Sequence, residues 1–156
     1  MQNSPPSDFV PDERLRLIVG SYRRLTGKPL IGDEPDGLAA LGMALWQAPR
    51  AIVAHGTEDD PVFFYGNRLA LQLFEMDFAA FSRLLSRSSA EPLAQESREK
   101  ALVKVTQQGF VEGYSGARIA RSGKRFMISN TTIWNLTDEA GVCHGQAATF
   151  ADWWPL

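Results

Sequence analysis

The sequence predicts an α+β domain in which helices collect on one side of a five-stranded antiparallel sheet. Two short apolar runs, AIVAHG and PVFFYGN, flank the turn-rich TEDD and indicate a hairpin that starts at Ala51. Three further strands joined by two tight turns are predicted between Phe110 and Phe150. Because neither group of strands would be stable alone, we expect both to join one sheet that curls round a helical connector and leaves an interior pocket.

Two helices are predicted before the sheet. Residues 1–11 hold three prolines and few apolar residues, which is typical of a disordered lead. Asp12 can cap a helix to about Thr26, and a second helix is expected from Gly37 to Gln47. We therefore divide the chain into a lead (1–11), an N-terminal helical flank (12–48) and a sheet domain (49–156). The first helix carries an apolar stripe that we expect to pack on the outside of the sheet or against its twin in a dimer: Leu15, Ile18, Val19, Tyr22 and Leu25.

Helices are also predicted between the two groups of strands. Asn67 is placed to cap a helix through Glu75, and a short helix is expected around residues 78–85. A longer helix is expected from about Glu91 to Gln108, where Ser88 or Ser89 can act as the cap.

The strand around residues 125–136 alternates between two sets of side chains. The even-numbered set is larger and more aromatic, so we expect it to face the interior: Phe126, Ile128, Asn130, Thr132, Trp134 and Leu136. Asn130 and Thr132 would then need partners, either in the protein or in a ligand.

Composition excludes several functional classes. A net charge of −2 argues against a dedicated nucleic-acid binder. The chain has no run of about 18 apolar residues that would predict a membrane span, and its N-terminus does not resemble a secretory signal, so a cytoplasmic location is expected. Cys143 is the single cysteine, and it would point away from His144 in a strand, so we expect no metal site.

Several phrases in one order resemble a known family. DPVFFYGNRLALQLFE, SRSSAEP, GYSGARI, SGKRF, IWNLTDEAG and GQAATFADW are similar to the MEKHLA family, over roughly Leu38 to Trp154. This family is a Per-ARNT-Sim (PAS) related module of small bacterial proteins and of the C-terminus of plant class III homeodomain-leucine-zipper factors. The resemblance implies a PAS-like fold and a broad sensor or interaction role, without a ligand or reaction that can be carried over.

A looser likeness connects the chain to flavin-binding light-oxygen-voltage domains. In that register the photoreactive cysteine falls at about Ser86, the phosphate-binding arginine at Arg87, and the two ring-binding asparagines at Ile128 and Arg118. The glutamine of that branch falls at or beside Gln146. Since the cysteine and both asparagines are lost, the resemblance implies no covalent flavin photochemistry. It does not identify a cofactor.

Six residues are candidates to line the pocket: Arg87, Tyr114, Arg118, Asn130, Trp134 and Gln146. Tyr114 and Arg118 share one face of a strand, and an inward arginine needs an anion or a carboxylate. Trp134 could stack on a planar ligand whose polar edge the amides of Asn130 and Gln146 read. The competing interpretations are a surface ion pair for Arg118, helix capping around Arg87, and a filled core around Trp134.

The leading interpretation is a non-catalytic PAS-like sensor or interaction module. Its expected partners are a planar or partly anionic small molecule in the cavity, or a protein, including a second copy bound through the N-terminal helix or the sheet. One alternative is a small cone-like enzyme of isomerase or hydrolase type, which the predicted inward residues disfavour because they include no acid-base pair. The other is a structural dimerisation module with a filled core.

Overall fold

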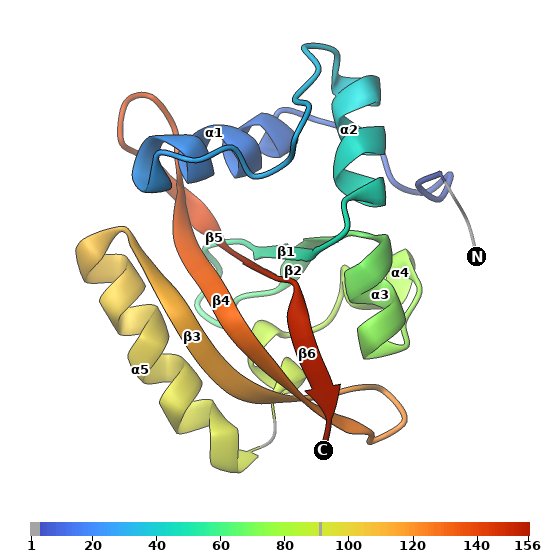
Figure 1. Cartoon of the computed structure of the whole chain (residues 1–156), viewed down its shortest axis with the longest axis vertical. Coiled ribbons are helices and arrows are strands. Elements are labelled where there is room, and N and C mark those ends of the chain that lie inside the picture. Colours follow the sequence, from blue (N-terminus) through green and yellow to red (C-terminus); the bar gives the residue numbers. More distant parts are fainter. Residues whose placement is uncertain (1–3, 91) are drawn as a thin grey trace.

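The structure is a computed structural model that describes residues 4–90 and 92–156. Its elements follow the predicted order of two strands, helices and three strands, preceded by two helices and followed by one additional strand (Figure 1). In chain order they are α1 (Arg14–Thr26), α2 (Leu38–Gln47), β1 (Ala51–His55), β2 (Phe63–Gly66), α3 (Arg68–Phe74), α4 (Phe78–Phe81), the 3₁₀ helix η1 (Ser86–Ser89), α5 (Pro92–Gln108), β3 (Phe110–Ile119), β4 (Arg125–Thr137), β5 (Cys143–Phe150) and β6 (Asp152–Pro155).

The strands form one antiparallel sheet in the order β2-β1-β5-β4-β3, which confirms the predicted fold class. The additional strand, β6, contains Asp152, Trp153 and Trp154 and pairs with β4. Thr132 pairs with Thr149 of β5 and Ser129 with Asp152 of β6, so β6 continues the register of β5 after a break at Ala151.

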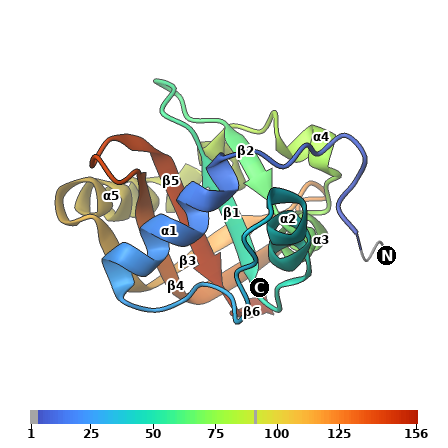
Figure 2. The same cartoon turned by 90° about the horizontal axis from the view of Figure 1, so that it is seen from above.

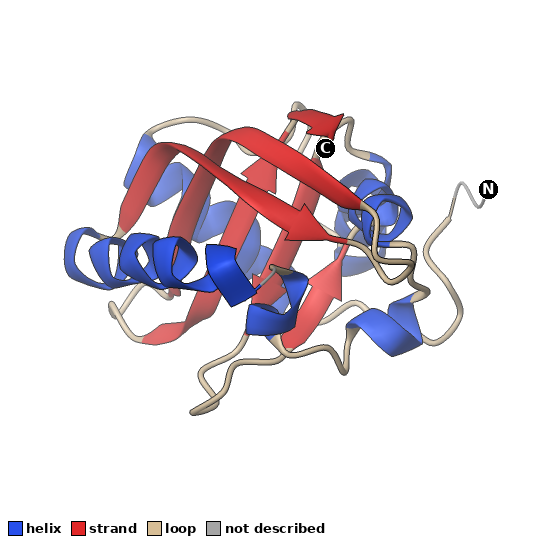
Figure 3. Cartoon of the chain, turned by 90° about the horizontal axis from the view of Figure 1, so that it is seen from below, coloured by secondary structure: helices blue, strands red, loops and turns tan. Residues whose placement is uncertain are grey.

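Helices cover both faces of this curved sheet, rather than collecting on one side as predicted. Figure 2 shows α1 lying across one face, and Figure 3 shows α5 lying across the other. The apolar stripe of α1 is buried against the sheet of its own chain, which is the first of the two packing modes predicted for it. Burial from both sides explains why all five residues of β1 are buried and why AIVAH shows no polar alternation.

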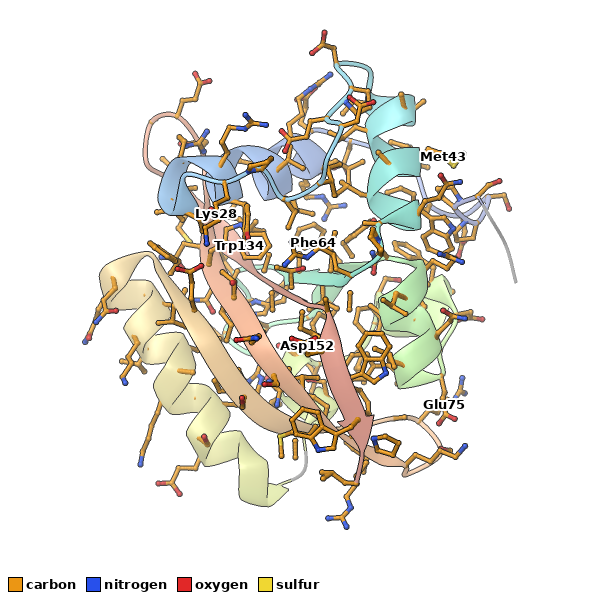
Figure 4. The ribbon with its side chains drawn as sticks, viewed as in Figure 1. Lys28, Met43, Phe64, Glu75, Trp134 and Asp152 are labelled. Carbon is orange, nitrogen blue, oxygen red and sulfur yellow. The ribbon has the colours of Figure 1, made fainter. Side chains whose placement is uncertain are left out.

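Two apolar cores result, one on each face of the sheet. The α1 core joins α1 and α2 to the outer side chains of the sheet, including Ile52, Tyr65 and Trp134. The connector core packs α3 and α4 against the inner side chains, including Val53 and Phe126. Figure 4 shows Trp134 between β4 and α1.

A bulge in β4 changes which side chains face inward. Asn130 has a φ of 52°, a left-handed conformation that asparagine tolerates better than most residues, and the pairing of β4 with β3 shifts around it. Phe126 and Ile128 face the connector core as predicted. Beyond Asn130 the alternation is displaced by one residue, so the predicted inward set is wrong for the second half of the strand.

The helix starts agree with the capping analysis at α3 but not at α1, whose N-cap position is Glu13 without a side-chain cap, although Asp12 Oδ1 accepts from the backbone N–H of Arg14 at 2.9 Å. The Asn67 side chain accepts a hydrogen bond from the backbone N–H of Ala70 at 3.2 Å, as predicted. Ser88 and Ser89, the caps predicted for the helix from about Glu91, lie instead in η1, where the Ser89 hydroxyl donates to the backbone oxygen of Ser86 at 2.7 Å. The residue that precedes α5 lies outside the described residues. Phe9, which falls in the segment predicted to be a disordered lead, packs its ring 5.6 Å from that of Tyr65 and 5.1 Å from that of Phe78.

Candidate ligand-binding site

A cavity of about 50 Å³ lies between the inner face of the sheet and the helices η1 and α5. All five strands of the main sheet order contribute side chains to it, together with Phe74 of α3. Most of its wall is apolar, and its polar side chains are few: His55, Ser86, Ser89, Arg98, Arg118, Thr131 and Gln146. A single water needs about 10–15 Å³, so the space holds roughly three to five water-sized groups.

Two buried arginines line this cavity, one from a helix and one from the sheet. Arg98 of α5 and Arg118 of β3 are each 7% exposed. Arg98 donates a hydrogen bond to the Ser86 hydroxyl. Arg118 donates to the backbone oxygen of Ala117 at 2.8 Å and to the Tyr114 hydroxyl at 3.4 Å. Burial, and next the charge of Arg118, lower the pKa of Arg98 to about 10, so the Arg98 guanidinium stays charged at neutral pH.

His55 reaches the same cavity from β1. Its Nδ1 lies 2.9 Å from the backbone oxygen of Gly56, so Nδ1 carries the proton in the neutral ring and Nε2 is left as an acceptor. Burial lowers the pKa of His55, and the charge of Arg98 acts in the same direction, which favours this neutral form.

Two of the predicted pocket residues line the cavity. Arg118 is one, which agrees with the inward orientation expected for it. Gln146 is the other, and its amide donates to Asn135 Oδ1 at 3.1 Å and to Thr106 Oγ1 at 3.3 Å. Tyr114 lies behind Arg118, with the guanidinium carbon 5.5 Å from its ring centroid, and does not itself line the cavity.

The other three predicted pocket residues lie elsewhere. Arg87 is half-exposed, and its Nε lies 3.0 Å from Asp60 Oδ2 in a surface ion pair. Asn130 is exposed at the bulge, and its Nδ2 donates to Asp152 Oδ2 at 3.3 Å. Trp134 is fully buried in the α1 core, because the bulge turns it to the opposite face of the sheet. Its predicted stacking on a cavity ligand is therefore wrong.

The sequence analysis missed Arg98, although a signal for it existed. Arg98, Leu102 and Val105 share one face of α5, and Arg98 is the charged member of that otherwise apolar stripe. His55 was likewise not among the predicted pocket residues. Within residues 4–90 and 92–156, no three His, Cys, Asp or Glu side chains gather into a metal site.

Gly145 lies at the edge of the cavity, where the backbone of β5 passes close to the backbone of β1. It has a φ of +143°, and a Cβ added there would lie 2.0 Å from the backbone oxygen of His55. We expect Gly145→Ala to destabilise the fold by about 2 kcal/mol or more, because both the conformation and the close approach exclude a side chain. Chemical denaturation compared with Gly141→Ala, where φ is +85° but no atom lies within 4 Å, separates the two causes. Equal losses would show that close approach to His55 contributes nothing.

Solved structures with the same arrangement define the class of fold. A light-oxygen-voltage domain studied with a flavin analogue aligns with a TM-score of 0.60 and 16% identity, over 75% of this chain and 84% of its own. The PAS domain of a protein from Colwellia psychrerythraea aligns with a TM-score of 0.59 and 15% identity, over 68% and 87%. The chain therefore has a PAS-like fold.

The family follows from the sequence itself. The MEKHLA domain model matches residues 12–155, so the chain belongs to the MEKHLA-domain family. The match begins in α1 rather than near Leu38, and so includes the N-terminal helical flank. Curated relatives include the homeobox-leucine zipper proteins HOX32 of Oryza sativa subsp. indica, 25% identical over 96% of this chain, and ATHB-9 of Arabidopsis thaliana, 24% identical over 89%. The chain spans only 18% and 17% of the length of these two relatives.

Every helix in the described part of the chain is too short or too polar to cross a membrane.

Proposed function

We propose that this protein is a non-catalytic PAS-like sensor module that binds a small molecule in the cavity beneath α5. The observation that carries the proposal is the combination of a PAS-like fold with an inner cavity at which two buried polar atoms, His55 Nε2 and Thr131 Oγ1, have no partner in the described structure. Buried polar groups normally have hydrogen-bond partners, so unpartnered polar atoms that face a cavity indicate that a bound molecule supplies the partner.

Two features support sensing over the alternatives. Among the described lining residues there is no carboxylate, so His55 has no acid beside it in the cavity with which to form a catalytic pair. The cavity is also bounded by side chains from a helix and from the sheet, so an occupant would touch two elements at once. Such contact allows binding to alter how α5 sits on the sheet.

Association with another protein is the route we propose for the signal. The stripe of α1 is already buried in its own chain, so a partner or a second copy would use a different surface. The exposed side chains of Trp154 and Leu156 form an apolar surface beside the first half of β4, which a partner could contact.

Mass spectrometry of the purified full chain tests the ligand directly. We expect the native protein to carry a bound small molecule, or to gain thermal stability with at least one compound of a small-metabolite panel, because ligands that bind only the folded state stabilise it. A native mass equal to the denatured mass, together with no stabilisation by any compound, would support the filled structural module instead.

A further inference from the structure

The chemical class of the ligand can be inferred from the charges that line the cavity. Arg98 and Arg118 are both buried, and among the described residues neither forms an ion pair with a carboxylate. Their hydrogen-bond acceptors in the described structure are neutral: the Ser86 hydroxyl, the Ala117 carbonyl and the Tyr114 hydroxyl. Burying a guanidinium without a counter-charge destabilises the folded state, and burying two that repel each other destabilises it further.

Two further polar atoms at this cavity have no partner in the described structure. They are His55 Nε2 and Thr131 Oγ1, on residues that are 9% and 1% exposed. They come from β1 and β4, on either side of β5, and both residues line the cavity. The site thus combines guanidinium donors with a hydroxyl and an imidazole that are free to contact an occupant.

The rest of the wall limits what the anion can be. Its apolar members include Val53, Phe63, Leu102, Ile133 and Phe150. A volume of about 50 Å³ fits a molecule of only a few heavy atoms, far below the roughly 300–1,000 Å³ of typical drug-sized ligand sites. Such a wall suits an anion with a short apolar tail better than a multiply charged oxyanion, whose remaining oxygens would face hydrocarbon.

We propose that the cavity binds a short-chain monocarboxylate, with its carboxylate between Arg98 and Arg118 and its tail against the apolar wall. The Thr131 hydroxyl donates to the carboxylate, while the neutral His55 ring, whose Nε2 is an acceptor, forms part of the surrounding wall. This inference rests on the proposed function and names its ligand class. Charge-assisted hydrogen bonds from arginine to carboxylate are among the stronger polar contacts in proteins, and the anion also cancels the repulsion between the two guanidiniums.

Binding would tie α5 to the sheet. Arg98 belongs to α5 and Arg118 to β3, so one carboxylate between them bridges the helix and the strand on which it packs. We expect the amides of α5 to exchange hydrogen more slowly when the site is filled, which gives a structural readout that is separate from affinity.

Calorimetric titration of the full chain with sodium propionate in HEPES buffer tests the proposal. Propionamide has the same size without the charge, and sodium nitrate and sodium sulfate are anions without the tail. We expect saturable binding of propionate with slower exchange in α5, no binding of propionamide, and weaker binding of both inorganic anions. Arg98→Met and Arg118→Met should each weaken propionate binding by roughly tenfold or more. Arg87→Met, which removes an arginine of the surface ion pair with Asp60, is the matched control and should leave binding unchanged.

Each contrary result has a defined meaning. The assignment would be overturned if propionamide bound as tightly as propionate. It would also be overturned if Arg87→Met lost as much propionate affinity as Arg98→Met and Arg118→Met. Nitrate or sulfate binding as tightly as propionate would make this a general anion site and overturn the monocarboxylate class. If propionate fails while mass spectrometry recovers another ligand, this inference falls and the sensor function stands. If neither is found, both fall.

Discussion

Replacing Trp134 with alanine is expected to destabilise the protein by about 3–5 kcal/mol, the range for truncating a large buried aromatic side chain. Trp134 is fully buried between β4 and α1, its ring centroid lies 4.9 Å from that of Tyr22, and its Nε1 donates to Ser21 Oγ at 3.0 Å. The change therefore leaves a void in the α1 core and removes a hydrogen bond between the helix and the sheet. Urea denaturation followed by circular dichroism measures the loss.

Two matched variants control this experiment. Trp154→Ala removes the same side chain where it is 47% exposed, on β6, and should cost about 1 kcal/mol or less. Trp134→Phe keeps most of the apolar burial and loses the indole N–H, so a stable protein remains for ligand titration. Because Trp134 lies on the face opposite the cavity, the Trp134→Phe protein should bind propionate with the same affinity as the wild type. A tenfold loss in Trp134→Phe would place the binding site on the α1 side.

Replacing Asn67 with alanine is expected to cost about 3 kcal/mol or more, because several buried backbone groups would lose their partner at once. The Asn67 side chain is fully buried and makes four hydrogen bonds. Its Oδ1 accepts from the N–H groups of Ile52 and Ala70, and its Nδ2 donates to the carbonyls of Leu45 and Arg50 at 3.1 and 2.8 Å. One side chain thus joins the end of α2, the segment that enters β1 and the start of α3. Urea denaturation measures the effect.

Asn67→Asp separates shape from charge at this position. The carboxylate has the same shape, but one of its oxygens would face the two carbonyls that Nδ2 now binds, so the folded state should raise the pKa of the aspartate above its unfolded value of about 3.9. Between the two pKa values the folded state then binds more protons than the unfolded state, and the variant should recover stability as the pH falls from the folded pKa toward the unfolded one. The measure is the difference in unfolding free energy from the wild type at pH 7 and pH 5. An equal difference at both values would show that the site tolerates the charge.

The candidate site was less predictable than the fold. Arg118 lines the cavity as expected, because it pairs with the inward-facing Phe126 in the first half of β4, before the bulge. Asn130 and Trp134 were placed wrongly, because a single left-handed residue in β4 shifts all later side chains to the other face. No local pattern marks such a bulge: an asparagine within a strand is compatible with a regular ladder or with a left-handed kink, and only pairing with both neighbouring strands decides between them.

Local chemistry in the sequence determined where the elements lie, which family the chain belongs to and the general architecture. Caps such as Asn67, the stripe of α1 and the alternating strands act over a few residues, so they can be recognised without coordinates. The tertiary structure decided which charged and polar side chains lie close together. Arg98 and Arg118 are 20 residues apart in the sequence, on a helix and a strand, and His55 lies on β1 in another part of the chain. They share a cavity only because α5 crosses the inner face of a sheet that also contains β1, a long-range arrangement that short-range patterns do not encode.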